Sequence, residues 1–433
     1  MPSNRRAFLR GVGAVALASP AAATQSAAAT QTGTATAPGL AWSHRYDAAG
    51  SATLGDLVPF DDGYALVGTV GTGSADAAAR GWIGRAGPEG GLRSDRTLGE
   101  TGTRLVTAVP AQDGLLAVGR TNVGGNDASH RNPYAARVGV DGEGGPEVRW
   151  ARTYQPTETD GIATAATAAE DGYVLAGAVD TGSGVRPWAT AIDDAGTVRW
   201  SWRGDGDLVA LGDAVATDDG VVLVGSVGDP ETPWAVSLDA AGTRRWRWTA
   251  DTDGGSRLEA ATPAPDGGAV IVGRRGFGAD DGDGWLLSLD AAGDLRWDRT
   301  YSRNVWNWHR DIAAIDGGYA LAGAIGDVNG GARSAWVLAV GPEGEERWEY
   351  RADAGTGAFA ARSVPDGSLL LAGSVDAADG SKPWFARLGG PAATGGFGVP
   401  TLPEVPSGAA PFGAGTVVGA AGLALVRRLS GDR

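Results

Sequence analysis

Short apolar runs recur along the chain at a nearly constant spacing, and each run ends at a glycine. The runs have the form Asp-Gly-Tyr-Ala-Leu-Val-Gly or a close variant, and they end at Gly68, Gly119, Gly177, Gly225, Gly273, Gly323 and Gly373. Apolar runs of this length between glycine-rich turns are typical of short strands, and a repeat of about 50 residues indicates a stack or a closed ring of small sheets. The sequence therefore predicts seven structural repeats.

Each repeat is expected to contain four strands. A run rich in Ala, Thr and Val precedes the glycine-ended strand, and such narrow side chains suit the crowded centre of a ring. A third strand follows and begins with an aromatic residue, at Trp82, Tyr134, Trp188, Trp234, Trp285, Trp336 and Trp384. After a turn of the type Asp-Ala-Ala-Gly, in which glycine supplies a positive φ, an outer strand carries Trp150, Trp200, Trp246, Trp297 or Trp348. We expect these tryptophans to pack sheet against sheet.

The two ends of the repeat array predict how the ring closes. The seventh repeat stops at Gly390 without an outer strand, whereas the segment 42–46 precedes the first repeat and is similar to the outer strand at Trp150. The N-terminal segment is therefore expected to supply the missing strand of the last sheet. Such pairing covers edges whose backbone donors and acceptors would otherwise lack partners.

The repeat frame, with WDRTY at 297–301 and GGYALAG at 317–323 as its strongest examples, resembles a repeat family common in secreted bacterial and archaeal proteins. The resemblance covers residues 42–390. It implies an all-β fold, a seven-bladed β-propeller of four-stranded blades closed by an N-terminal strand, and no single activity. The stretches 238–246 and 289–297 also resemble the docking motifs of quinoprotein propellers, which usually have eight blades, a tryptophan floor for the cofactor and an acidic calcium set. We locate none of these three features in the sequence.

The termini carry features of targeting segments. Residues 1–30 resemble a twin-arginine signal peptide, with Arg5 and Arg6 ahead of an apolar stretch, which predicts export. Residues 31–41 form a low-complexity spacer. Residues 391–410 form a Pro/Gly/Ala linker, and 411–433 form an apolar segment with a basic end. We expect this last segment to be a membrane anchor or a processed sorting tail similar to those of haloarchaeal surface proteins, although its apolar part is short for a span of about 30 Å; the alternative is a disordered tail.

The composition narrows the function classes. The net charge is −15 and Lys382 is the one lysine among 36 basic residues. An acidic excess with almost no lysine suits a chain that is soluble in molar salt, so our working hypothesis is a haloarchaeal source. The same charge argues against nucleic acid as a partner. The absence of cysteine excludes disulfides, thiolate chemistry and cysteine-ligated zinc.

One segment interrupts the repeat frame and is the first candidate site. Residues 302–311 (SRNVWNWHRD) are expected to form a connecting loop, on which Trp306, Trp308, His309 and Arg310 would recognise a sugar or a partner protein. The alternative is that the loop folds over the mouth of the central channel and buries these side chains.

A recurring acidic residue near the entry to the inner strand is the second candidate. Its members are Asp56, Asp160, Asp213, Glu259 and Asp311. They are expected either to ring one mouth of the channel and attract a cation, or to cap turns. The three histidines are scattered, and the acidic turns at 251–253 and 280–283 lack the ligand spacing of a calcium loop. No metal or cofactor is predicted, with calcium or a quinone left open.

These features together predict an exported β-propeller at the cell surface that binds a protein or glycan partner without catalysis. The alternative is a propeller enzyme. It would be either a quinoprotein-like dehydrogenase or a polysaccharide-acting lyase or hydrolase that uses carboxylates at the channel mouth.

Overall fold

The computed structural model describes residues 36–46, 52–71, 79–123, 130–140, 145–154, 160–252, 254–277, 282–303, 306–326, 333–377 and 380–389. The predicted signal peptide and the predicted C-terminal linker and anchor lie outside these residues. Within the described residues, no helix is long and apolar enough to cross a membrane.

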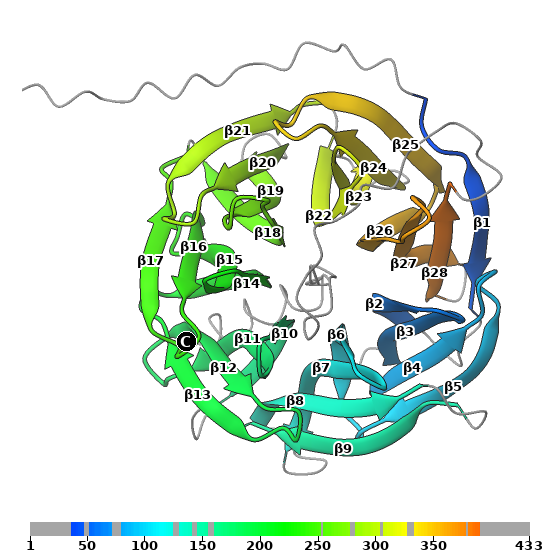
Figure 1. The fold of residues 1–433 in the computed structure, drawn as a ribbon, viewed down its shortest axis with the longest axis horizontal. Coiled ribbons are helices and arrows are strands. Elements are labelled where there is room, and N and C mark those ends of the chain that lie inside the picture. The colour runs from blue at the N-terminus through cyan, green and yellow to red at the C-terminus, as the bar shows by residue number, and fades with distance from the viewer. Residues whose placement is uncertain are drawn as a thin grey trace, which may run out of the picture.

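In the part of the chain that the structure describes, 28 strands form seven four-stranded antiparallel sheets around a common axis (Figure 1). We number the sheets as blades. Blade 1 contains β2 (Ala52–Phe60), β3 (Gly63–Val70), β4 (Arg80–Ala86) and β5 (Leu92–Leu98); blade 2 contains β6 (Arg104–Ala111), β7 (Gly114–Val123), β8 (His130–Gly139) and β9 (Glu147–Thr153); blade 3 contains β10 (Gly161–Ala169), β11 (Gly172–Asp180), β12 (Val185–Ile192) and β13 (Val198–Arg203).

The remaining blades repeat this order from the axis outward. Blade 4 contains β14 (Leu208–Thr217), β15 (Gly220–Val227), β16 (Thr232–Leu238) and β17 (Arg244–Thr249); blade 5 contains β18 (Gly255–Pro263), β19 (Ala269–Phe277), β20 (Asp283–Leu289) and β21 (Leu295–Tyr301); blade 6 contains β22 (Trp306–Ile315), β23 (Gly318–Gly326), β24 (Ser334–Val340) and β25 (Glu346–Ala354); blade 7 contains β26 (Thr356–Ser363), β27 (Leu369–Ala377), β28 (Gly380–Leu388) and, outermost, β1 (Leu40–Arg45). The predicted seven-bladed β-propeller is confirmed.

The ring closes through the N-terminal strand, as the sequence predicts. Strand β1 pairs antiparallel with β28, with Trp42 opposite Arg387 and Arg45 opposite Trp384. The Trp42 ring lies 4.9 Å from the ring of Phe385. The first and last segments of the propeller therefore share one sheet, so that neither leaves an unpaired edge inside the blade.

The outer tryptophans of blades 2, 3 and 4 join each of these blades to the next. The indole N–H of Trp200 donates to the carbonyl of Ala240 at 2.8 Å, in the Asp-Ala-Ala-Gly turn of the following blade. Trp246 makes the same bond to Ala291 at 3.0 Å. In the first of these turns Gly242 has a φ of 79°, and a Cβ there would lie 2.6 Å from the ring of Trp200. The turn glycine thus has two roles: it adopts the positive φ of the hairpin, and it leaves room for the ring of the neighbouring tryptophan.

Every inner strand carries a β-bulge opposite a motif glycine. In blade 1, for example, Leu54 pairs with Gly68, and the register then shifts before Asp56. The same shift follows the motif glycine in the other six blades. A Cβ on any of the seven glycines would lie within 2.1 Å of an inner-strand carbonyl oxygen. The recurring glycine is therefore explained by the bulge that it faces.

The extra residue of each bulge forms a ring around the axis, which we call the bulge ring. Its members are Gly55, Val106, Thr164, Gly212, Glu259, Arg310 and Phe359. A Cβ on Gly55 would lie 2.6 Å from the carbonyl oxygen of Val106, and a Cβ on Gly212 would lie 2.6 Å from that of Glu259. The members of these two pairs therefore face each other across a blade interface.

Candidate functional site

Residues 306–311 of the segment predicted to be a connecting loop are part of the inner strand β22. Strand β22 begins at Trp306, and Trp308 pairs with Ala324 while His309 pairs with Gly323. The prediction of a loop was wrong because an inner strand accepts large side chains here: the position of His309 holds leucine in four other inner strands, and that of Trp308 holds Arg104 in blade 2 and Arg257 in blade 5. The side chain of Trp306 lies outside the described residues, so its role as a ligand contact stays a prediction.

His309 is fully buried between blades 5 and 6. Its ring stacks on Trp336 with 4.4 Å between centroids and meets Tyr301 edge to face at 6.2 Å. Burial, assisted by the nearby charge of Arg303, lowers the pKa of His309 to about 3. The imidazole is therefore neutral at physiological pH, and its place among aromatic rings makes it part of the interface between the blades.

Trp308 and Arg310, on the inner strand β22, lie close to a third residue, Arg274 on β19. The guanidinium carbon of Arg310 lies 3.4 Å from the centroid of the Trp308 ring, and that of Arg274 lies 4.9 Å from the same ring. The Arg310 guanidinium also lies 5.3 Å from the ring of Phe359 in blade 7. Three blades thus contribute to this group of side chains, and cation–π contacts hold both arginines against aromatic rings.

Two acidic residues and one more arginine complete what we call the arginine–tryptophan cluster: Glu231, Arg257, Glu259, Arg274, Trp308 and Arg310. Arg257 is fully buried, and its Nε donates to Glu231 Oε2 at 2.8 Å. Glu259 Oε1 lies 3.8 Å from Arg257 Nη1 and 4.0 Å from Arg274 Nε. Burial lowers the pKa of Arg310 to about 9, with Glu259 opposing the shift and the neighbouring arginines adding to it. Arg310 therefore still carries its positive charge at neutral pH.

The five acidic residues singled out from the sequence occupy three different settings. Asp56, Asp213 and Asp311 follow the bulge directly, Glu259 is itself a bulge residue, and Asp160 precedes β10. Asp160 accepts from the backbone N–H of Arg131 at 2.8 Å and from its Nε at 2.9 Å. The structure therefore separates Asp160 and Glu259 from the other three.

The three aspartates after the bulge join the inner strands of neighbouring blades. Asp213 accepts from the backbone N–H of Ala214 in its own blade at 2.7 Å and from that of Ala261 in the next blade at 3.0 Å. Asp56 bridges Leu57 and Ala108 in the same way, at 2.7 and 3.0 Å, and Asp311 bridges Ile312 and Ala361, at 2.9 and 2.8 Å. All three are fully buried.

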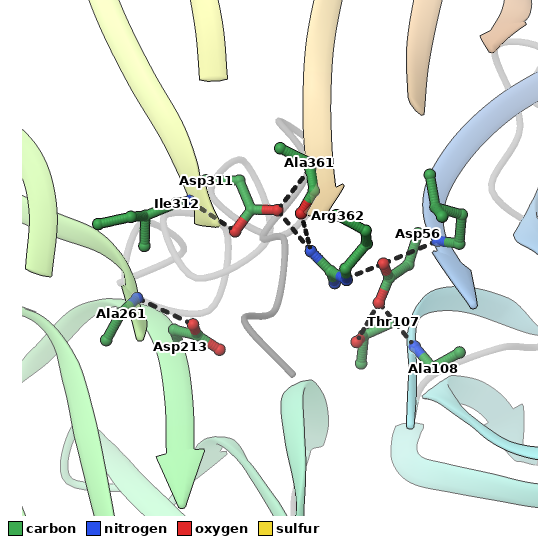
Figure 2. A network of polar contacts seen from close by, with 10 residues as sticks. Asp56, Thr107, Ala108, Asp213, Ala261, Asp311, Ile312, Ala361 and Arg362 are labelled. Carbon is green, nitrogen blue, oxygen red and sulfur yellow. Dashed lines mark hydrogen bonds and ion pairs between the residues drawn. The ribbon is translucent and has the colours of Figure 1, made fainter. Parts of the chain in front are cut away.

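One arginine of blade 7 connects two of these aspartates. Figure 2 shows Arg362 between the carboxylates: its Nη2 donates to Asp56 Oδ1 at 2.6 Å and its Nη1 to Asp311 Oδ2 at 2.7 Å. Burial raises the pKa of Asp56, and it raises that of Asp311 to about 6, although Arg362 lowers both. The two carboxylates conversely raise the pKa of Arg362. Blades 6, 7 and 1 are thereby tied together at the axis.

The described residues contain no cluster of side chains suited to binding a metal ion. No group of three or more His, Cys, Asp or Glu residues is placed there to hold a metal ion. The buried aspartates have backbone N–H groups and Arg362 as partners, which is the arrangement of a structural network. The arginine–tryptophan cluster is a second set of charged groups, contributed by blades 4, 5 and 6, and it includes an aromatic ring.

Sequence reasoning found Trp308, His309, Arg310 and Glu259, but it missed Arg257, Arg274 and Glu231. A signal for two of them is present in the repeat frame. Arg257 and Arg274 pair across β18 and β19 beside a motif glycine, and Arg104 and Arg120 hold the equivalent positions in blade 2. Other repeats place apolar or small residues at most of these positions, so the two arginine pairs depart from the frame as clearly as Trp308 does.

Comparison with known proteins gives fold-level likeness only. No family model matches the sequence, and a comparison with curated protein sequences finds no match. Among solved structures, the chain is similar to Kuenenia stuttgartiensis hydrazine synthase (10% identity, TM-score 0.49, covering 76% of this chain and 94% of that one) and to Sqt1 from Chaetomium thermophilum (14%, 0.46, covering 75% and 80%). It is also similar to a protein of unknown function from Bacteroides caccae (14%, 0.32), of which it spans 61% while 43% of this chain is covered.

Proposed function

We propose that this protein is an exported, non-catalytic β-propeller at the cell surface, and that it binds its ligand at the arginine–tryptophan cluster. The observation that carries the proposal is the pair of guanidinium groups, from Arg274 and Arg310, that lie against the ring of Trp308. Trp308 and Arg274 remain partly exposed. Aromatic and arginine side chains that are held in place and still reach solvent are typical of binding hot spots.

The arrangement of the acidic residues supports binding over hydrolysis. A glycoside hydrolase of the usual kind needs two carboxyl groups that flank the substrate. Asp56, Asp213 and Asp311 are instead fully buried and bonded to backbone N–H groups of two blades each. A polysaccharide-acting lyase or hydrolase and a quinoprotein-like dehydrogenase remain the enzymatic alternatives, and the experiment below includes them as outcomes.

The binding proposal is tested on the purified full-length chain with a glycan array, a reducing-sugar assay and an absorbance spectrum. We expect a ligand that binds the wild type and not Trp308→Ala. Trp248→Ala is the matched control, because Trp248 is also a half-buried tryptophan but lies on the outer strand β17. Release of reducing ends, or the absorbance of a quinone, would instead assign one of the two enzymatic alternatives.

A second variant pair separates binding from folding. Trp285 is 2% exposed at a blade interface, so Trp285→Ala should destabilise the protein by about 3–5 kcal/mol. Trp308→Ala should cost less, because its ring is partly exposed. If thermal unfolding shows an equal loss for both variants, Trp308 serves packing and the proposed site is lost.

Export is the part of the proposal that rests on the sequence alone. Replacing both Arg5 and Arg6 with Lys should leave the protein in the cytoplasm, because the proposed signal depends on its two arginines, whereas other export routes accept lysine in the basic region of a signal peptide. Fractionation of cells that express the wild type and the double variant measures this directly. Equal amounts of both at the surface would contradict a twin-arginine signal.

A further inference from the structure

We propose that strand β1 is a releasable strap, which separates from β28 while the ring of seven blades stays closed. The interface between blades 7 and 1, which we call the closing interface, is then held by contacts between these two blades themselves, with Arg362 as the lock nearest the axis. Three features support this proposal: the path of the chain, the hydrogen bonds of Arg362, and the small share of β1 in the apolar core of the closing interface.

The path of the chain sets the closing interface apart. At the other six blade interfaces the chain runs directly from the outer strand of one blade to the inner strand of the next, as from β13 to β14. At the closing interface the chain enters blade 1 from β1, which is the outermost strand of blade 7 (Figure 1). Strands β1 and β28 lie at opposite ends of the propeller sequence, so no hairpin joins them. β1 can therefore separate from β28 without disturbing a turn, and β26 to β28 are held to blade 1 by noncovalent contacts.

Arg362 holds the closing interface beside the axis. Its Nη2 donates to Asp56 Oδ1 in blade 1 at 2.6 Å, and its Nη1 donates to Asp311 Oδ2 in blade 6 at 2.7 Å. The other oxygen of Asp56 accepts from Thr107 Oγ1 and from the backbone N–H of Ala108 in blade 2, at 2.9 and 3.0 Å. One line of hydrogen bonds thus runs through blades 6, 7, 1 and 2 (Figure 2). The side chain of Arg362 is 11% exposed and that of Asp56 is 0% exposed, so these charge-assisted bonds are strong and little screened by salt.

The apolar core of the closing interface also lies between blades 7 and 1. Its buried members in these blades are Leu54, Leu57, Tyr64, Leu66, Trp82 and Ala86 from blade 1, and Ala360, Leu370, Ala372 and Phe385 from blade 7. Among the described residues of the N-terminal segment, Tyr46 is the one buried member of this core, and it follows β1. Trp42 of β1 is half-buried against it. Separation of β1 therefore leaves most of the core in place.

Strand β1 contacts the closing interface from the outside. The Trp42 ring lies 4.9 Å from that of Phe385. His44 Nε2 lies 2.6 Å from the carbonyl oxygen of Glu89, and the Tyr46 hydroxyl donates to that of Gly90 at 2.5 Å, both in the turn after β4. The side chains of β1 itself are exposed or half-buried. Strands of this kind, with exposed backbone hydrogen bonds and few buried side chains, open at a lower free energy than the core.

Hydrogen exchange on the full-length chain, followed by mass spectrometry, tests the release of β1. Strand β13 is the matched control, because it has the same 6-residue length and the same order of exposed and half-buried side chains as β1. It differs in being joined to its partner β12 by a hairpin. We expect the amides of β1 to exchange at least about tenfold faster than those of β13. Exchange of β1 that is no faster than that of β13 would overturn the proposal.

Thiol labelling tests whether the ring stays closed, since the natural chain has no cysteine to interfere. Ala360→Cys reports on the closing interface, and Ala165→Cys reports on the interface of blades 3 and 4. Both alanines follow a bulge directly and are 0% exposed. The two thiols should react with N-ethylmaleimide at rates within about threefold of each other. A faster reaction at position 360 would show that the ring opens together with β1, and the strap would be refuted.

Arg362→Gln tests the lock. It should raise the rate at position 360 relative to that at position 165 by at least about tenfold, and the ratio cancels a loss of stability that affects both sites. Arg131→Gln is the matched control, because Arg131 also binds an aspartate of a neighbouring blade, Asp160, at 2.9 Å. It should leave the ratio unchanged.

A second variant covers the case in which Arg362→Gln does not fold. Asp56→Asn removes the charge that Arg362 binds, while its amide oxygen can still accept from Thr107, and it should raise the same ratio. An unchanged ratio in whichever of the two variants folds would show that Arg362 does not hold the closing interface. These measurements are made without a ligand, so their outcome is independent of the proposed function.

Discussion

Charged side chains at the axis of this propeller take part in joining the blades. Asp56, Asp213 and Asp311 each accept backbone N–H groups from two blades. Backbone groups beside a bulge lose their ladder partners, and a buried N–H without a partner is costly. The aspartates therefore replace hydrogen bonds that the bulges remove. This explains why carboxylates are tolerated at positions with no exposure to solvent.

His309 should make the protein sensitive to acid. Its folded-state pKa of about 3 lies below the unfolded value of about 6.5, so the unfolded chain binds the proton first as the pH falls. Stability should therefore decrease between pH 6.5 and 3, by up to roughly 4–5 kcal/mol. In His309→Phe the ring can still stack on Trp336, and this loss should disappear. Melting temperatures of both proteins across this pH range measure the effect, and parallel curves would contradict it.

Asp311 should act in the opposite direction over part of the same range. Burial raises its pKa to about 6 in the fold, above the unfolded value of about 3.9, so the folded chain binds the proton first. Its contribution to stability should fall by roughly 3 kcal/mol as the pH rises from about 4 to 6. The difference in unfolding free energy between the wild type and Asp311→Asn, measured by denaturant at each pH, should decrease over that interval. A difference that stays constant or increases with pH would show that Arg362 compensates the buried charge completely.

At the scale of the strand, the bulge and the motif glycine form one unit. The glycine has no Cβ because the carbonyl oxygen of the bulged strand occupies that position in all seven blades. The glycine that ends each recurring apolar run is thus required by the bulge in the neighbouring inner strand. The position of the bulge also determines which residue of each inner strand is the extra one, and hence which residues belong to the bulge ring.

Gly177→Ala tests this coupling. An added Cβ would lie 1.9 Å from the carbonyl oxygen of Ile162, and a backbone atom cannot move aside without disturbing the pairing of β10 and β11. We expect a loss of about 3 kcal/mol, at the upper end of overpacking effects. Gly91→Ala is the control, since nothing lies within 4 Å of a Cβ there, and it should change stability by less than about 0.5 kcal/mol. Equal chemical denaturation midpoints for the two variants would refute the coupling.

For the whole molecule, the sequence predicts the architecture well because the number of strands in each repeat determines how the ring closes. The missing outer strand of the last repeat and the extra strand at 42–46 determine the pairing of β1 with β28. The candidate site was predicted only in part, because its acidic residues lie at different register positions relative to their motif glycines. Asp56, Asp213 and Asp311 lie at the same distance before their motif glycines, whereas Asp160 and Glu259 do not. A bulge shifts the register by one residue, so grouping these five by approximate position concealed three separate structural settings.

The closure of the ring predicts that a disulfide can lock it. Ser43 in β1 lies opposite Ala386 in β28, and the equivalent pair in blade 3, Ser201 and Thr190, brings its side-chain oxygens within 2.9 Å. Cysteines at 43 and 386 should therefore meet at a distance that allows a disulfide.

The cross-link would join strands from opposite ends of the propeller and so reduce the freedom of the unfolded chain, which stabilises a protein by roughly 2–4 kcal/mol. Because the natural chain contains no cysteine, no other pairing competes within one molecule. The double variant should melt at a higher temperature when oxidised than when reduced, whereas either single variant should show no such difference. If the oxidised double variant forms the bond but melts no higher, separation of β1 from β28 is not part of unfolding, and the N-terminal strand contributes less to stability than its place in the sheet implies.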